Sequence, residues 1–444
     1  MFNFSRFIVL VFLHFSCFAH DTIIMDEESE TFLEDIIEKL AKALNYNKKI
    51  PVYISSSPVL NAFATQRGEI VINAGALVNC SDVCELIAIL AHEVGHIAGN
   101  HITTFLAIQP DIVRGGLVVM LIGAVASVFA RDPSPLVTGI FGGQHMMHNM
   151  AAAKLRQKEN MADSKSAEAV KKLGLPIFKS FVSIHEKLGN GIPTYSEYES
   201  THPLSKDRVA KFRRLYDEEK KKKFDNEKLQ FIKTLQNKFE LIQTKMKALI
   251  FNPDYVLTLY FNPKNDIEKY AKAIALYRNN KFEESEKLID ELLNNKQEIF
   301  NPANLTEIKS MCLIQRGKLP DAAKIAYQHL KGREIHRDLS FIYAHAIIEG
   351  ELDKSQVKQA IKIVNKVKIK YDDLSCTILL GKLCSMNGEE DRASLCAAEF
   401  ASAIGDEEDA KIHAQKALKS SNKFVRRKAQ DIVSSIHDKS EAKE

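Results

Sequence analysis

Residues 88–101, AILAHEVGHIAGNH, carry the side chains best suited to chemistry, because three histidines and a glutamate fall within ten residues. His92 and His96 are four residues apart, so on an α-helix they lie about 40° apart and face one point. Neutral imidazoles are good zinc ligands, and Glu93 lies beside that face. This HExxH pattern predicts zinc-dependent hydrolysis with Glu93 as general base toward water. The alternative is a pair of buried histidines that bind no metal.

A catalytic zinc site needs a third protein ligand. His101 follows His96 by five residues and lies about 140° around the helix, so we expect it to face elsewhere. In the string KENMAD, Glu159 and Asp163 are four residues apart on one helical face. Glu159 can complete a site of two histidines and one glutamate, and Asp163 can accept the free N–H of a ligand histidine. We therefore predict one zinc ion per chain, held by His92, His96 and Glu159.

The catalytic domain, residues 20–215, is predicted to combine helices with a small β-sheet. Apolar periodicity and turn residues predict its elements, which are helices over 26–46, 83–99, 151–174 and 177–189 and strands over 50–57, 61–66 and 69–77. Asp82 and Glu85, three residues apart, resemble a capping box at the start of the histidine helix. Gly95 would let another element approach that helix closely.

Residues 112–130 are apolar enough to span a membrane. A single span there would place His92 and Glu159 on opposite sides, where they could not share a metal. We therefore predict that residues 112–145 form an apolar lid or hairpin that packs on the protein or contacts a membrane surface peripherally.

The N-terminus is typical of a secretory signal, with one positive charge in MFNFSR, an apolar stretch and a small residue at Ala19. We predict a signal peptide over residues 1–19 and export to the periplasm; the alternative is an uncleaved anchor. Six cysteines remain after cleavage and none forms a CxxC pair. We expect them to be small buried residues, with room for one disulfide bridge.

The C-terminal part is helical throughout. Residues 216–265 are predicted to form a charged helical linker, and residues 266–440 a series of helical pairs with short turns at RNNK, RGKL and IGDEE. This pattern resembles tetratricopeptide (TPR) repeats, whose stacks bind peptides or partner proteins; an ordinary helical bundle is the alternative. The whole chain is thus expected to be mainly α with a small β-sheet.

These motifs resemble the HtpX and CAAX-prenyl-protease superfamily of zinc metallopeptidases, whose fingerprint is HExxH followed by a distal ExxxD. Within it, the chain is similar to BepA-like periplasmic proteins, which join a protease domain to TPR repeats. NAFAT and GEIVINAGAL resemble the strand and hairpin before the zinc helix, and THPLSKDR resembles the family's THP…R segment. The resemblance covers nearly the whole mature chain and implies a gluzincin-like protease domain followed by a helical solenoid.

The resemblance also implies roles for two further residues. His202 would approach the zinc and hold the enzyme latent, although THP is also an ordinary turn before a helix. Arg208 would stabilise the developing oxyanion or pair with an acid. On physical grounds, an exposed strand near the cleft can bind an extended, unfolded chain by β-augmentation. The candidate strand consists of Asn61, Ala62, Phe63 and Ala64.

The expected activity is an exported zinc endopeptidase that degrades misfolded or unassembled outer-membrane β-barrel proteins. The resemblance implies that the TPR-like domain docks at the outer-membrane barrel assembly machinery. The net charge of +4 over 444 residues gives no argument for nucleic acid as a partner. The rival is a holdase or assembly chaperone whose zinc site is blocked by His202. A cytosolic scaffold is a third alternative.

Overall fold

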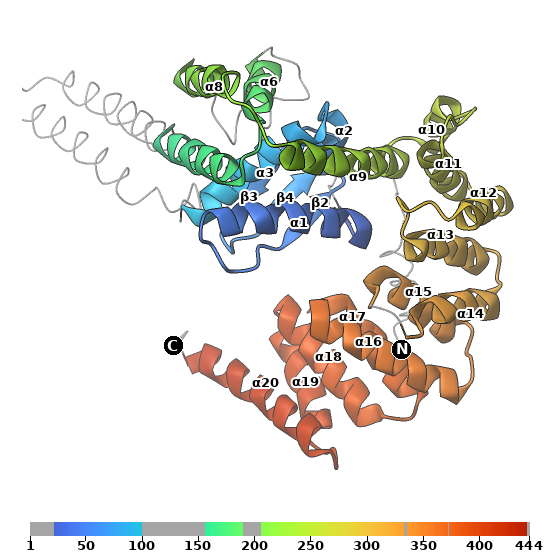
Figure 1. Ribbon diagram of the computed structural model, residues 1–444. Helices are drawn as coiled ribbons and strands as arrows, with labels where there is room; N and C mark the ends of the chain where they lie inside the picture. Colours follow the sequence, from blue (N-terminus) through green and yellow to red (C-terminus); the bar gives the residue numbers. More distant parts are fainter. Residues whose placement is uncertain (1–21, 100–155, 190–205, 333–334, 372, 442–444) are drawn as a thin grey trace, which may run out of the picture. The chain divides into compact units, whose positions relative to one another are not determined.

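The computed structural model describes residues 22–99, 156–189, 206–332, 335–371 and 373–441 (Figure 1). The predicted signal peptide, the apolar segment 112–145, His101 and His202 lie outside the described residues. The chain divides into two compact units. Unit 1 comprises Met1–Met25 and Leu33–Leu229, and unit 2 comprises Asp26–Phe32 and Gln230–Glu444.

Unit 1 contains a four-stranded sheet in the order β1-β2-β4-β3. The strands are β1 (Ile23–Ile24), β2 (Val52–Ser55), β3 (Ala62–Ala64) and β4 (Ile70–Asn73). β2 and β4 are parallel, and β1 and β3 pair antiparallel at the two edges. Ile54, Ile70 and Ile72 are fully buried, whereas Tyr53 and Phe63 are exposed. This alternation is what a half-buried sheet requires.

The predicted strand over 69–77 is wrong in its second half. β4 ends at Asn73, and Ala74–Asn79 form helix α2. A short apolar run does not distinguish a strand from a buried helix, and tertiary packing decides here. A Cβ at Gly75 would lie 2.1 Å from the carbonyl oxygen of Pro58, so the chain turns at a position that only glycine can occupy. The two-residue strand β1 was not predicted.

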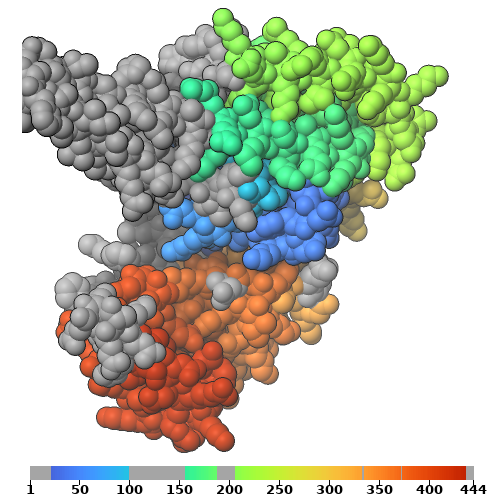
Figure 2. Space-filling model, turned by 90° about the vertical axis from the view of Figure 1, so that its left-hand side faces the viewer, coloured from blue at the N-terminus to red at the C-terminus, as the bar shows by residue number. Residues whose placement is uncertain are grey.

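Helix α1 (Glu27–Ala43) begins with Glu27, Glu28 and Glu30, as the positive end of a helix dipole favours. Within unit 1, Leu33, Ile37 and Leu40 share its buried face. Residues near the N-terminus, coloured blue, form part of the surface that Figure 2 shows. Helix α1 therefore follows the apolar period that the sequence predicted.

Helix α3 (Val83–Ala98) carries the histidine motif and starts at the predicted cap. The Glu85 N–H donates to Asp82 Oδ1 at 2.9 Å, and Glu85 Oε2 accepts from the Ser81 N–H at 2.7 Å. The same buried carboxylate accepts from Ser183 Oγ at 2.7 Å and from Lys187 Nζ at 2.6 Å, both on helix α6 (Phe178–Gly189). The cap of α3 thus also fixes α6 against it.

Helix α8 (Lys206–Glu219) packs on α6. The rings of Phe181 and Phe212 stack with centroids 4.4 Å apart. At the end of α8, both carboxylate oxygens of Glu219 lie 3.2 Å from the Phe178 N–H, which opens α6. An acid at a helix N-terminus is stabilising. This pair of contacts holds α8, and with it Arg208, in a fixed position relative to α3.

Unit 2 is built of consecutive helices, each in contact with the next along the chain from α10 to α20. They are α9 (Asn226–Ile250), α10 (Pro253–Leu259), α11 (Asp266–Arg278), α12 (Phe282–Asn295), α13 (Pro302–Gln315), α14 (Leu319–Leu330), α15 (Arg337–Glu349), α16 (Lys354–Tyr371), α17 (Leu374–Met386), α18 (Glu390–Ile404), α19 (Glu407–Ala417) and α20 (Lys423–Glu441). Alternate helices α11, α13, α15 and α17 also contact one another.

The helical pairs and their turns follow the predicted pattern. Asn280, Gly317 and Gly405 have φ values of 60°, 72° and 82°, and each lies in a predicted turn. Glycine and asparagine favour this left-handed region. Assignment of the pairs to TPR repeats stays a prediction. Among the described helices, none combines the length and apolarity needed to cross a bilayer.

The predicted linker over 216–265 differs from the structure. α8 ends at Glu219 and a separate helix, α9, begins at Asn226. Most of α9 belongs to unit 2 and buries apolar side chains at Phe239, Ile242 and Met246. The density of charge in this stretch hid an apolar face with helical spacing.

All six cysteines in the described residues are free, and five of them are buried. They are Cys80, Cys312, Cys376, Cys384 and Cys396, with Cys84 half-buried. This agrees with their expected role as small core residues. Burial raises the pKa of the Cys80 thiol and that of Cys312, the latter to about 11, which disfavours the reactive thiolate.

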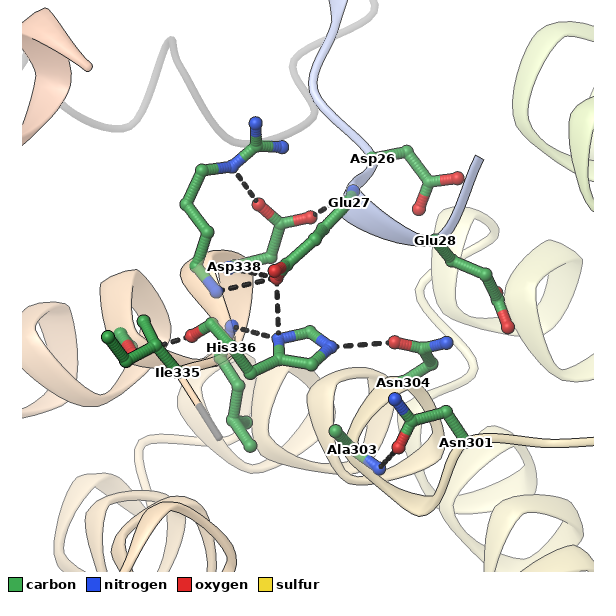
Figure 3. Close-up of polar contacts among 12 residues, drawn as sticks. Asp26, Glu27, Glu28, Asn301, Ala303, Asn304, Ile335, His336 and Asp338 are labelled. Atoms are coloured by element: carbon green, nitrogen blue, oxygen red, sulfur yellow. Dashed lines mark hydrogen bonds and ion pairs between the residues drawn. The ribbon is translucent and has the colours of Figure 1, made fainter. Parts of the chain in front are cut away.

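Unit 2 includes the first residues of α1, which dock on α15 through exchanged carboxylates (Figure 3). Asp338 Oδ2 accepts from the Glu27 N–H at 2.7 Å, and Glu27 Oε2 accepts from the Arg337 N–H at 2.5 Å. The Arg337 guanidinium also pairs with Glu30 at 2.5 Å. Asp338 of α15 thereby caps the N-terminus of α1, and Glu27 of α1 caps the N-terminus of α15.

Lys245 forms a second cluster of charges at the start of α1, which we call the Lys245 cluster. Its buried Nζ atom lies 2.5 Å from Asp26 and 2.8 Å from Glu28. Burial alone would lower the pKa of Lys245, but the two carboxylates raise it well above its usual value. We expect Lys245→Met to lower the free energy of unfolding by about 3–5 kcal/mol, because the buried Asp26 and the partly buried Glu28 lose their partner.

Urea denaturation of unit 2 measures this change. Lys247→Met, at a half-buried lysine on the same helix, is the matched control and should cost less than about 1 kcal/mol. Equal effects of the two substitutions would contradict a stabilising role for the Lys245 cluster.

Candidate metal centre

Helix α3 meets the helix over residues 156–173 at Gly95. A Cβ at Gly95 would lie 2.6 Å from the backbone oxygen of Ala162, so only glycine allows this approach. The predicted role of Gly95 in close packing is confirmed. Glu159 and Asp163 lie three residues before and one residue after Ala162. The contact therefore brings both carboxylates to the histidine face of α3.

The three residues predicted as ligands are brought together. His92 Nε2 lies 3.1 Å from Glu159 Oε2 and 3.1 Å from His96 Nε2, and His96 Nε2 lies 3.3 Å from Glu159 Oε1. Donors bound at about 2.0–2.2 Å to one tetrahedral ion lie about 3.3 Å apart. The side chains are buried, and in the described part of the chain they form the one group with metal-ligand geometry. The donor set therefore fits a metal ion.

Asp163 orients the first of these ligands. Its Oδ1 atom lies 3.0 Å from His92 Nδ1, which leaves Nε2 directed at the donor cluster. A carboxylate behind a ligand histidine fixes its tautomer and ring orientation. Burial would raise the pKa of Asp163, but the hydrogen bonds from His92 and Arg208 hold it well below its usual value. Asp163 is therefore ionised at neutral pH.

The two histidines have different electrostatic surroundings. Burial favours neutral His92, but Glu159 and Asp163 outweigh burial and raise its pKa to about 10. A metal ion bound to Nε2 must displace the proton held there. At His96, burial is the largest influence and lowers the pKa, so this imidazole is neutral, as a ligand must be.

Arg208 joins the two acids of the helix over 156–173. Its Nε and Nη2 atoms donate to the two oxygens of Asp163 at 2.7 and 2.9 Å. Nη1 lies 2.9 Å from Glu159 Oε2. Arg208 is only 2% exposed. Of the two roles considered for it, pairing with an acid is the one that this geometry displays.

Glu93 and the candidate substrate strand lie beside the cluster. Glu93 is fully buried on α3. Strand β3, which holds Ala62, Phe63 and Ala64, lies at the sheet edge and contacts α3. Asn61 precedes it and is buried, whereas Phe63 is 37% exposed. The last strand of the described sheet thus lies next to the metal-binding helix.

His185 is a buried residue near this centre that sequence analysis did not single out. Its Nδ1 atom lies 2.6 Å from the Phe181 carbonyl, and its ring centroid lies 5.3 Å from that of Phe212. Burial, aided by the charge of Arg208, lowers its pKa to about 4, so the imidazole is neutral. A single histidine on an amphipathic helix carries no signal that separates it from the core.

Comparisons with known proteins bear on the same part of the chain. Residues 27–216 match the family described as Peptidase family M48. The chain is also 28% identical over 172 residues to the mitochondrial metalloendopeptidase OMA1 of Danio rerio. That match covers 38% of this chain and 35% of the relative, so the chain spans about a third of the relative's length. Together with the clustered donors, these matches support a metallopeptidase of family M48 within residues 27–216.

Proposed function

We propose that the protein is a zinc-dependent endopeptidase that cleaves unfolded or misassembled proteins. The observation that carries this proposal is the group formed by His92, His96 and Glu159, whose donor atoms are spaced as a tetrahedral ion requires. The buried Glu93 follows His92 directly in the sequence. The name of the OMA1 relative, a metalloendopeptidase, supports internal cleavage of a polypeptide.

The three ligands would hold zinc, which supplies Lewis acidity to water and to the scissile carbonyl. Glu93 takes the proton from the attacking water and returns it to the leaving amine. Asp163 holds the His92 ring by its Nδ1 atom. Arg208 holds Glu159 and Asp163 together and helps to keep Asp163 ionised. The burial of these groups limits access of bulk water, which strengthens the electrostatic effects on the reaction.

The edge of β3 is proposed to bind substrate in an extended conformation. β4 pairs with one side of this strand, and β3 is the last strand of the described sheet. A peptide added there would pair through its backbone, with few demands on its side chains. Such binding suits unfolded chains of varied sequence.

We place this activity in the periplasm, after removal of residues 1–19, on unassembled outer-membrane β-barrel proteins. The helical pairs of unit 2 would dock the enzyme at the barrel assembly machinery. Stacked helical pairs commonly bind partner proteins. The contact of each helix with the next in unit 2 supports this docking role.

Removal and return of the metal tests the proposal. A chelator is expected to abolish cleavage of an unfolded β-barrel protein by the purified enzyme, and one equivalent of zinc should restore it. Magnesium, which prefers oxygen ligands in octahedral geometry, should not restore activity. Full cleavage by metal-free protein, verified by elemental analysis, would overturn the proposal.

Arg208 is expected to act as a positioning residue. Arg208→Lys keeps a positive charge but loses the two-pronged contact with Asp163. We expect zinc affinity and kcat/KM to fall about 10- to 100-fold. Arg213→Lys is the matched control, because Arg213 lies on the same helix in an exposed pair with Glu186. Equal zinc affinity in both variants would contradict the positioning role.

A further inference from the structure

Helix α16 carries a row of lysines on its exposed face. Its 18 residues include six lysines and no aspartate or glutamate. Five of the lysines recur at every fourth residue and all five are exposed: Lys354, Lys358, Lys362, Lys366 and Lys370. A step of four residues advances about 40° around a helix. The middle three therefore lie within about 80° of one another and the whole row within about 160°.

In the described part of the chain, no acid forms an ion pair with a lysine of the row. Among the described residues, the ion pair that α16 forms involves Lys368, which lies off the row and contacts Glu399. Some other basic groups of unit 2 do meet acids, as the half-buried Arg316 meets Glu283 and Glu286. Like charges four residues apart destabilise a helix. The row thus lowers the stability of α16, and packing of the other face offsets that loss.

An exposed isoleucine points to the same side of α16 as the lysines. Ile369 is 86% exposed, the largest value among the large hydrophobic side chains of the described residues. On a helical projection it lies about 20° from Lys362, so it faces the same way as the row, and along the helix it lies near the C-terminal end of the row, between Lys366 and Lys370. The opposite face is apolar and buried at Val357, Ile361 and Val364. Packing within unit 2 therefore leaves the lysines and Ile369 outside.

We propose that this face of α16, formed by the five lysines of the row and Ile369, binds the surface of a bilayer that contains anionic lipids. Lysines near such a surface are attracted to its negative potential, and an apolar side chain among them can enter the headgroup boundary. Lysine is a point charge without the planar fork of arginine. The row therefore fits a diffuse layer of headgroups better than one bound phosphate.

Two other polyanions fit the face less well. Binding of single-stranded nucleic acid relies on aromatic side chains on which bases stack, whereas the aromatic residue beside the row, Tyr371, is half-buried with its hydroxyl bonded to Glu27. An acidic polypeptide would form ion pairs with the lysines, but it would leave Ile369 without a role in binding. The lipid surface accounts for both the charge and the exposed apolar side chain.

Vesicle binding by the full chain tests the proposal. The probes are vesicles of phosphatidylcholine alone and vesicles of phosphatidylcholine and phosphatidylglycerol in equal amounts. The triple variant Lys358→Gln, Lys362→Gln, Lys366→Gln is expected to bind the anionic vesicles about 100-fold more weakly than the native chain. Its binding to neutral vesicles should be unchanged. Added salt should weaken the native chain more than the variant.

The matched control removes three exposed lysines in α19 and the turn that follows it: Lys411→Gln, Lys416→Gln and Lys419→Gln. It has the same net charge as the triple variant and should keep the binding of the native chain. Equal losses in the two triple variants would overturn the proposal, because only total charge would then matter. Circular dichroism verifies that both variants fold, and peptide hydrolysis should be the same in both.

Ile369→Ser separates a lipid surface from an acidic polypeptide. We expect this change to weaken binding to anionic vesicles several-fold while leaving the salt dependence unchanged. Unaltered vesicle binding would contradict the role of Ile369. If the native chain binds polyglutamate but not anionic vesicles, the lipid proposal is wrong and the face is a site for acidic polypeptides.

Discussion

Glu93→Gln is expected to lower peptide hydrolysis by at least about 100-fold while zinc stays bound. General base catalysis contributes about 100- to 10,000-fold in enzymes, and glutamine cannot accept the proton of the attacking water. The substitution keeps the size of a fully buried side chain. Because Glu93 is not among the three clustered donors, the metal content should remain at one ion per chain.

The measurement is kcat/KM on an unfolded protein together with metal content by elemental analysis. Glu85→Gln is the control for replacement of another buried glutamate on α3, since Glu85 contacts Ser183 and Lys187 at the other end of the helix. Glu85→Gln should lower the stability of the protein more than its activity. Activity of Glu93→Gln equal to that of the native enzyme would exclude Glu93 as the base.

Gly95→Ala is expected to damage the metal site from outside the donor group. Its Cβ would lie 2.6 Å from the Ala162 backbone oxygen, a distance that forces the two helices apart. Overpacking of this kind costs about 1–3 kcal/mol of stability. Because Glu159 and Asp163 flank Ala162, their shift should also lower zinc affinity by at least about 10-fold.

The measurements are zinc affinity by competition with a chelating dye and stability by thermal unfolding. Gly381→Ala is the matched control on helix α17, where a Cβ would meet its nearest side-chain atom at 3.4 Å. That change should leave zinc affinity intact, because it lies outside unit 1. Native zinc affinity in Gly95→Ala would show that the close approach does not set the position of Glu159.

Local sequence rules predicted much of the metal centre. Helical geometry alone directed His92 and His96 to one point, whereas the exclusion of His101 stays a prediction. The same geometry placed Glu159 and Asp163 on one face, and the glycine at 95 indicated a close neighbour. These inferences depend on spacing within a single helix, which the sequence displays directly.

The remaining features depend on contacts between distant residues. The paired contact of Arg208 with Asp163 spans 45 residues, and the exchange of carboxylates between Glu27 and Asp338 spans 311 residues. No periodicity reveals such pairs. The sequence of residues 216–265 did not reveal the burial of Lys245 for the same reason, because its partners Asp26 and Glu28 lie near the start of the chain.

The coordination sphere of the metal tests the central claim most directly. A crystal structure of the zinc-loaded protein, with anomalous scattering at the zinc edge, identifies the ion and its ligands. We expect one zinc ion per chain bound by His92 Nε2, His96 Nε2 and Glu159 at about 2.0–2.2 Å. Zinc bound by any other set of residues, or no metal at these three side chains in zinc-saturated protein, would contradict it.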